Sequence, residues 1–188
     1  MSYQLLADSD GKRHPVYSQA EEMSCALACL RMIEDRMESR THTGGESRIK
    51  QISAQHPGSL LASQLEGENW GLGIGTHQEN VARTFQTLGV RLTRIEGFDP
   101  TGDYKFFWNK SRIREGAPAL IMLGWYQLQQ GVRVRAGGHF ILAARITSKG
   151  HVVVLDPFKG TLHELRGSNG VYLNHGLSGR IEILFYTG

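Results

Sequence analysis

The sequence has little cysteine, and its two cysteines lie close together in the chain. Cys25 and Cys29 are the only thiols among 188 residues. Side chains four positions apart on a helix share a face but do not easily reach the geometry of a disulfide. No further cysteine and no His-x-x-x-His pair is present to complete a zinc site. We therefore expect two free thiols, no disulfide framework and no structural metal.

A strong charge of one sign and a long apolar run are also missing. The chain has 21 Lys and Arg residues against 18 Asp and Glu residues, a formal net charge of +3, and these residues are scattered. Binding to nucleic acid needs a clustered basic face. A membrane-spanning helix needs about 20 consecutive apolar residues, and no run approaches that length. We therefore expect no nucleic-acid partner and no membrane span.

The N-terminal residues lack the features of a secretory signal, because no charged start precedes a long apolar core. We therefore expect the protein to be cytoplasmic, or to be delivered into a target cell by a specialised secretion system. No motif calls for a cofactor. The triplet Gly71-x-Gly73-x-Gly75 follows no predicted strand and lacks the spacing of a dinucleotide-binding loop.

The length of the chain predicts one domain over residues 1–188. Apolar spacing predicts helices at residues 24–37, 76–88 and 103–115, and a short helix at 60–66 inside a polar, glycine-rich stretch from 39 to 75. Alternating patterns predict strands at residues 90–95, 119–123, 132–135, 139–146, 151–156, 162–165 and 180–186. Residues 1–18 are expected to form an irregular lead-in with 14–17 extended. Helices followed by antiparallel strands indicate the α+β class.

Cys25 lies where a polar loop runs into an apolar helix. Ser24 is a suitable N-cap residue, and the backbone N–H groups and dipole of a helix start stabilise a thiolate. A buried core position is nevertheless the common explanation of a single cysteine, and it is our interpretation of Cys29. Cys25 is a candidate nucleophile only if the chain also supplies a base, a group that orients the base, and donors for an oxyanion.

A predicted β-hairpin in the last third of the chain brings a base and a carboxylate together. In its simplest register Ile146 pairs with His151, and Ile141 pairs with Asp156. His139 then lies on the same face as Asp156, as a diagonal neighbour at roughly 7–8 Å between backbones. A slip of one residue would place the two on opposite faces. The hairpin therefore predicts an Asp156–His139 hydrogen bond, although each residue alone would be ordinary in a core or a turn.

Gln19 precedes Cys25 by six residues. A side-chain amide at this place can donate a hydrogen bond to a developing oxyanion, together with the backbone N–H of Cys25. Without that context Gln19 would be an ordinary surface residue.

The pattern Gln19-x5-Cys25, followed by Ala-x-Ala-Cys-Leu-x-Met-Ile, resembles the papain-fold cysteine peptidases. It is most similar to the bacteriocin-processing peptidases of the C39 type and to the related type III effector proteases. The resemblance continues in family order through the blocks Gly75-Thr76, Leu88-Gly89-Val90, Gly116-x-Pro118-Ala-Leu-Ile-Met-Leu, Gly138-His139-Phe140-Ile-Leu and His151-Val-Val-Val-Leu-Asp156-Pro157.

This resemblance implies a papain-like fold, with an N-terminal helical half that carries Cys25 and a C-terminal antiparallel β half that carries His139 and Asp156. It implies a cysteine endopeptidase with a Cys-His-Asp triad, Gln19 as an oxyanion donor, and no cofactor or metal. Cleavage after Gly-Gly is the first expectation, in a narrow cleft for which Trp70, Trp125 or Tyr126 would supply aromatic walls; a core position for these aromatics is an equal alternative.

The resemblance also suggests a biological setting, that of a bacterial effector or interbacterial toxin. Its partners would be a protein or peptide substrate and a cognate inhibitor or immunity protein. The C39 peptidases usually have Asp-Cys-Gly where this chain has Ser24-Cys25-Ala26, which leaves specificity open. Two alternatives remain: another thiol acyl-transfer enzyme on the same fold, such as a peptidoglycan amidase, a deamidase or a transglutaminase-like enzyme, or a catalytically inert C39-like binding module.

Overall fold

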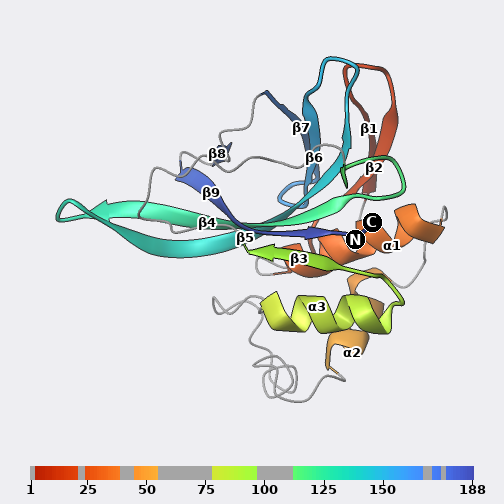
Figure 1. Ribbon diagram of the computed structural model, residues 1–188, viewed down its shortest axis with the longest axis horizontal. Helices are drawn as coiled ribbons and strands as arrows, with labels where there is room; N and C mark the ends of the chain where they lie inside the picture. Colours follow the sequence, from red (N-terminus) through yellow and green to blue (C-terminus); the bar gives the residue numbers. More distant parts are fainter. Residues whose placement is uncertain are drawn as a thin grey trace.

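Three helices gather on one side of a large antiparallel sheet in the computed structural model of the chain (Figure 1). The structure describes residues 3–20, 24–38, 45–54, 78–96, 112–166, 171–174 and 177–188. The helices are α1 (Cys25–Glu38), α2 (Gly45–Ala54) and α3 (Gln78–Thr87). No helix within these ranges is both long and apolar enough to cross a membrane. The combination of helices with a large antiparallel sheet confirms the predicted α+β class.

The large sheet is built from consecutive hairpins and one returning C-terminal strand. Its order is β3-β9-β4-β5-β6-β7, with β8 paired to β9. All of these neighbours are antiparallel. The strands are β3 (Thr93–Glu96), β4 (Ala119–Gln129), β5 (Val132–Ile146), β6 (Val152–Asp156), β7 (Thr161–Leu165), β8 (Val171–Asn174) and β9 (Leu177–Tyr186).

The alternation of side chains along β5 and β6 divides the apolar core between the two faces of the sheet. Phe140 and Leu142 join the cluster that α1 buries, together with Leu155 from β6. Ile141 and Ala143 belong to a second cluster on the other face of the sheet. Because successive side chains of a strand point to opposite faces, residues 140–143 of β5 and 152–155 of β6 are buried on both faces and are all apolar.

The β5–β6 hairpin contains a β-bulge that the simple register did not predict. Next to the turn, Ile146 pairs with Val152 rather than with His151. The register then shifts between Ala143 and Arg145, and Leu142 pairs with Leu155. The predicted pairing is therefore wrong by one residue at the turn, and its register is restored beyond the bulge. An extra residue in one strand, here Ala144, is the defining feature of such a bulge.

The N-terminal segment forms a two-stranded sheet, where the sequence predicted an irregular lead-in. Strand β1 (Tyr3–Ala7) pairs antiparallel with β2 (Arg13–Tyr17), and the turn between them places Asp8 among four donors. The Asp8 carboxylate accepts hydrogen bonds from the backbone N–H groups of Asp10 and Lys12, at 3.0 and 2.9 Å. It also contacts His14 Nε2 at 2.9 Å and Arg145 Nη1 at 2.5 Å. These contacts fasten the hairpin to β5.

Several further predictions need correction. Helix α2 was not predicted because its apolar pattern is short. In the structure its Ile49 side chain is fully buried. Residues 113–115 are not part of a helix; Arg114 instead forms a β-bridge with Ala117. Strand β5 runs without a break, although Gly137-Gly138 was expected to interrupt it. The helix predicted at 60–66 and most of the one at 103–115 lie outside the described residues.

Replacing Asp8 by asparagine tests how far the N-terminal hairpin depends on its buried carboxylate. The substitution puts an amide donor opposite donors of His14 and Arg145. We expect Asp8→Asn to lower the free energy of unfolding by about 3 kcal/mol, measured by urea denaturation. The exposed ion pair between Lys12 and Glu115 provides the control. Glu115→Gln should cost less than about 1 kcal/mol, and equal losses in the two variants would contradict this account.

Candidate functional site

Cys25 lies at the start of α1, in which residues 25–35 are all buried. Cys25 is the first residue of α1, and its exposed fraction is 8%, whereas Cys29 one turn later is fully buried. The Cys29 thiol donates to the backbone carbonyl of Phe140 at 3.4 Å, and burial raises the pKa of this thiol well above its usual value. Cys29 is therefore a core residue, as expected. Its bond to Phe140 fixes the first turn of α1 beside His139.

His139 and Asp156 are in direct contact. His139 Nε2 lies 2.7 Å from Asp156 Oδ1, and Asp156 is completely buried at the end of β6. The same carboxylate oxygen accepts the backbone N–H of Phe158 at 2.7 Å, which fixes its orientation. Leu142 pairs with Leu155, the residue before Asp156, so the alternation of side chains along the two strands places His139 and Asp156 on the same face of the sheet.

Cys25 is the second group that acts on His139, and its thiol raises the pKa of the imidazole by hydrogen bonding and by charge. Because Nε2 contacts Asp156, the other ring nitrogen, Nδ1, is the one left for the sulfur. Burial alone would lower the pKa of His139, but the hydrogen bonds to Asp156 and Cys25 and their charges outweigh it and raise this pKa to about 10. The imidazole thus stands between a carboxylate and a thiol and is favoured in its protonated form at neutral pH.

Gln19 lies in the loop that follows β2, and its backbone is attached to the strand end that carries Asp156. The N–H of Gln19 donates to the carbonyl of Pro157 at 2.9 Å. The next residue is held from the opposite side, since the N–H of Ala20 donates to Glu46 of α2 at 2.9 Å. These two bonds bring the Gln19 loop to the immediate neighbourhood of the His139–Asp156 pair.

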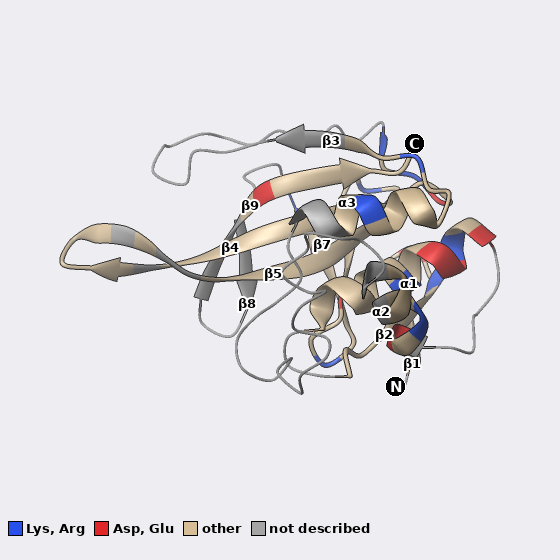
Figure 2. Cartoon of the chain, turned by 90° about the horizontal axis from the view of Figure 1, so that it is seen from below, with Lys and Arg blue, Asp and Glu red and all other residues tan. Residues whose placement is uncertain are grey.

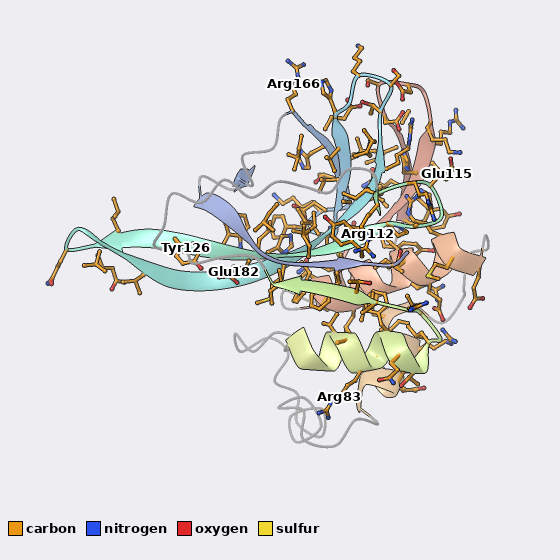
Figure 3. All side chains as sticks on the ribbon, in the orientation of Figure 1. Arg83, Arg112, Glu115, Tyr126, Arg166 and Glu182 are labelled. Atoms are coloured by element: carbon orange, nitrogen blue, oxygen red, sulfur yellow. The ribbon has the colours of Figure 1, made fainter. Side chains whose placement is uncertain are left out.

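An aromatic side chain flanks the imidazole. The rings of Trp125 and His139 are stacked, with centroids 6.2 Å apart and planes at 23°. Tyr126 points to the opposite face of β4 and donates its hydroxyl to Glu182 (Figure 3). Of the three aromatics predicted as walls of the site, Trp125 is therefore next to the candidate base and Tyr126 is directed away from it. Trp70 lies outside the described residues.

Two supporting residues were missed by the sequence analysis. Glu46 holds the Gln19 loop from α2, a helix too short in its apolar pattern to be recognised. The N–H of Phe158 orients Asp156, and the Asp-Pro-x sequence is a signal that could have indicated it, because Asp side chains often bond to the backbone two residues ahead.

The arrangement is suited to acyl transfer by a thiol. A nucleophile, a base and a carboxylate that orients the base are connected in series, which is the general form of an activated nucleophile. Among the residues that the structure describes, no group of three or more His, Cys, Asp or Glu side chains could hold a metal ion. The Cys25, His139 and Asp156 side chains can perform nucleophilic attack and proton transfer.

The titration of His139 tests the chain of contacts from Asp156 to Cys25. In histidine-labelled protein, NMR should show His139 still charged at pH 8, because its pKa is raised to about 10. Asp156→Asn and Cys25→Ala each remove a contact that raises this pKa while burial, which lowers it, remains; both variants should titrate at lower pH.

His14 is the internal control for that titration. Burial lowers its pKa, the Asp8 contact opposes this, and Arg36 Nη2 donates to its Nδ1 at 3.1 Å, so the ring should be neutral at pH 8 in every variant. A wild-type His139 that is neutral at pH 8 would contradict the arrangement.

No protein-family model matches this chain, and a search of curated proteins found no match either.

Proposed function

We propose that the protein is a papain-like cysteine peptidase that cleaves a peptide bond in a target protein with Cys25, His139 and Asp156. The observation that carries this proposal is the position of His139, which contacts the Asp156 carboxylate with one ring nitrogen at 2.7 Å and whose pKa is raised by Asp156 and by the Cys25 thiol. Each of the three groups has an ordinary structural explanation alone. Their connection in series, with the sulfur at a helix start, is the combination that nucleophilic catalysis requires.

In the proposed mechanism the Cys25 sulfur, as thiolate, attacks the carbonyl carbon of the scissile bond. His139 then gives its proton to the leaving amine, the C–N bond breaks, and an acyl group remains on Cys25 as a thioester. A water molecule gives a proton to His139 and attacks the thioester, the C–S bond breaks, and the acid product leaves. Asp156 holds the imidazole in the orientation needed for both proton transfers.

Gln19 and the backbone N–H of Cys25 would stabilise the oxyanion of the tetrahedral intermediates. The bonds that hold the Gln19 loop support this role, because a donor acts efficiently only when its position is fixed before the reaction. Trp125 would form one wall beside the scissile bond, and a Gly-Gly sequence before that bond remains our first proposal for specificity. An effector or toxin setting remains part of the proposal and depends on the family resemblance alone.

Replacing Cys25 by alanine is the direct test, and Cys29→Ala is the matched control, since it removes the other thiol of the same helix. Wild type and Cys29→Ala should be labelled once by a thiol-directed suicide inhibitor, and Cys25→Ala should not be labelled, as measured by intact mass. N-terminal mass spectrometry of cells that express each form should find new protein N-termini with wild type and Cys29→Ala but not with Cys25→Ala.

The outcomes of this experiment separate the alternatives. The same new N-termini with Cys25→Ala would disprove the peptidase. Cys25-dependent release of peptides from peptidoglycan, or Cys25-dependent deamidation of glutamine, would identify another acyl-transfer enzyme on the same site. A Cys25 that does not react with the inhibitor would indicate an inert binding module.

The contribution of Gln19 is tested separately. Gln19→Ala keeps the backbone bond to Pro157 but removes the amide, and loss of one oxyanion donor typically lowers kcat on the order of 10²–10³-fold. We expect a loss of this size in steady-state kinetics on a peptide taken from a cleavage site of the wild type. Ser18→Ala, one residue away in the same loop, should keep the wild-type kcat; an unchanged kcat in Gln19→Ala would remove Gln19 from the mechanism.

A further inference from the structure

The hairpin of β4 and β5 extends beyond the rest of the sheet as a two-stranded arm. Figures 1 and 2 both show it protruding from the body of the protein. The pairing of β4 with β9 ends at Tyr126, whereas the pairing of β4 with β5 continues to Gln129 and Val132. In the part of the chain that the structure describes, residues 127–134 of the arm therefore pair only with each other.

The arm carries apolar side chains in contact with solvent. Its exposed fractions are 73% at Leu128, 64% at Val132 and 37% at Val134. A projecting two-stranded ribbon with exposed apolar side chains tends to aggregate, and proteins normally avoid such surfaces. Its presence indicates that another polypeptide binds the arm and covers these side chains. The two faces of the arm differ, and the pairing shows which residues belong to each.

One face of the arm leads directly to the candidate base. The register places Val132 opposite Gln129, Val134 opposite Gln127, and His139 opposite Leu123. Directly paired residues point to the same face, and every second residue of β4 shares that face. Val132, Val134, Trp125 and His139 therefore form one row along the sheet, which we call the arm row. Leu128 points to the opposite face.

The arm row reaches the candidate base at Trp125, where β5 contains two consecutive glycines. Trp125 pairs with Gly137 and stacks on His139, and Gly138 is exposed. A β-bulge at Ala136 separates these glycines from Val134, since Trp125 pairs with Gly137 and Tyr126 with Arg135. The Trp125 ring covers Gly137, and the exposed Gly138 leaves space for another polypeptide to approach the β5 backbone beside His139.

The edge of β5 beside the arm row is also available for pairing. Strand β6 pairs with β5 only from Leu142 onward, and the carbonyl of Phe140 is occupied by the Cys29 thiol, so the open part of this edge is residues 132–138, which have no strand partner on that side within the described residues. An open edge supplies backbone donors and acceptors to an extended peptide, and alternate side chains of that peptide contact the adjacent face.

We propose that the arm is a substrate-binding element, and that its occupant is an extended, apolar segment of the substrate protein distant from the bond that is cut. The segment would lie along β5, bury Val132 and Val134, and enter the site past Trp125 and Gly138. The occupant is assigned to the substrate because the arm row is continuous with His139. This inference rests on the proposed function and adds that long polypeptides are preferred over short peptides.

The test compares the double variant Val132→Thr/Val134→Thr with Leu128→Thr, in the full-length protein. Threonine keeps the shape and strand preference of valine and removes an apolar methyl group. Each form digests two probes: the denatured, intact proteins of a cell extract, and the short tryptic peptides of the same extract. Cleavage rates at the wild-type sites are followed by N-terminal mass spectrometry, and Cys25 labelling by the suicide inhibitor reports on the catalytic centre.

We expect the double variant to cleave intact proteins about tenfold more slowly, because two buried valine contacts are weakened. Its rates on short peptides and its Cys25 labelling should equal those of the wild type, and Leu128→Thr should match the wild type on both probes. Wild-type rates on intact proteins in the double variant would overturn the inference, as would equal losses in both variants or a dimer that depends on Val132 and Val134. A wild type that cleaves neither probe would overturn the proposed function itself, and this inference with it.

Discussion

The contact between His139 and Asp156 is the interaction on which the rest of the site depends. Asp156 is completely buried, and a buried carboxylate is costly unless it is paired and hydrogen-bonded. The imidazole and the backbone N–H of Phe158 supply these partners at 2.7 Å each. Once this pair is formed, one nitrogen of the ring is committed to the carboxylate, and the ring can present only the other one to Cys25. The geometry of the thiol contact is thus decided by a bond on the far side of the ring.

Three separate parts of the fold converge on this pair. Helix α1 brings Cys25, and the bond of Cys29 to the carbonyl of Phe140 fixes the helix to the residue next to the base. The loop after β2 brings Gln19, which is tied to Pro157 beside Asp156. The N-terminal hairpin that precedes this loop is in turn fastened to β5 through Asp8 and Arg145. These three parts follow one another within residues 3–38, and long-range contacts with β5 and with Pro157 place them beside the pair.

The parts of the fold with a repeated apolar pattern could be predicted from the sequence. Helix α1 begins within one residue of its predicted start because its buried side chains recur at helical spacing, and β6 is apolar because both of its faces are covered. The N-terminal hairpin could not be predicted, since its stability comes from the contacts of Asp8 with His14 and Arg145, and Arg145 is 137 residues away in the chain. The hydrogen bond of His139 with Asp156 was predicted by hairpin pairing, but the contact of Glu46 with the Gln19 loop depends on tertiary packing.

The extra residue at Ala144 has a consequence for how this hairpin can change. Counting from the turn, where Ile146 faces Val152, an uninterrupted ladder would set Asp156 across from Leu142 and turn it away from His139. The extra residue Ala144 shifts the pairing by one position, so that Asp156 points to the same face of the sheet as His139. The length of the turn between β5 and β6 and the presence of Ala144 therefore depend on each other. If the turn changed in length by one residue, His139 and Asp156 would stay on the same face only if Ala144 were also removed from β5.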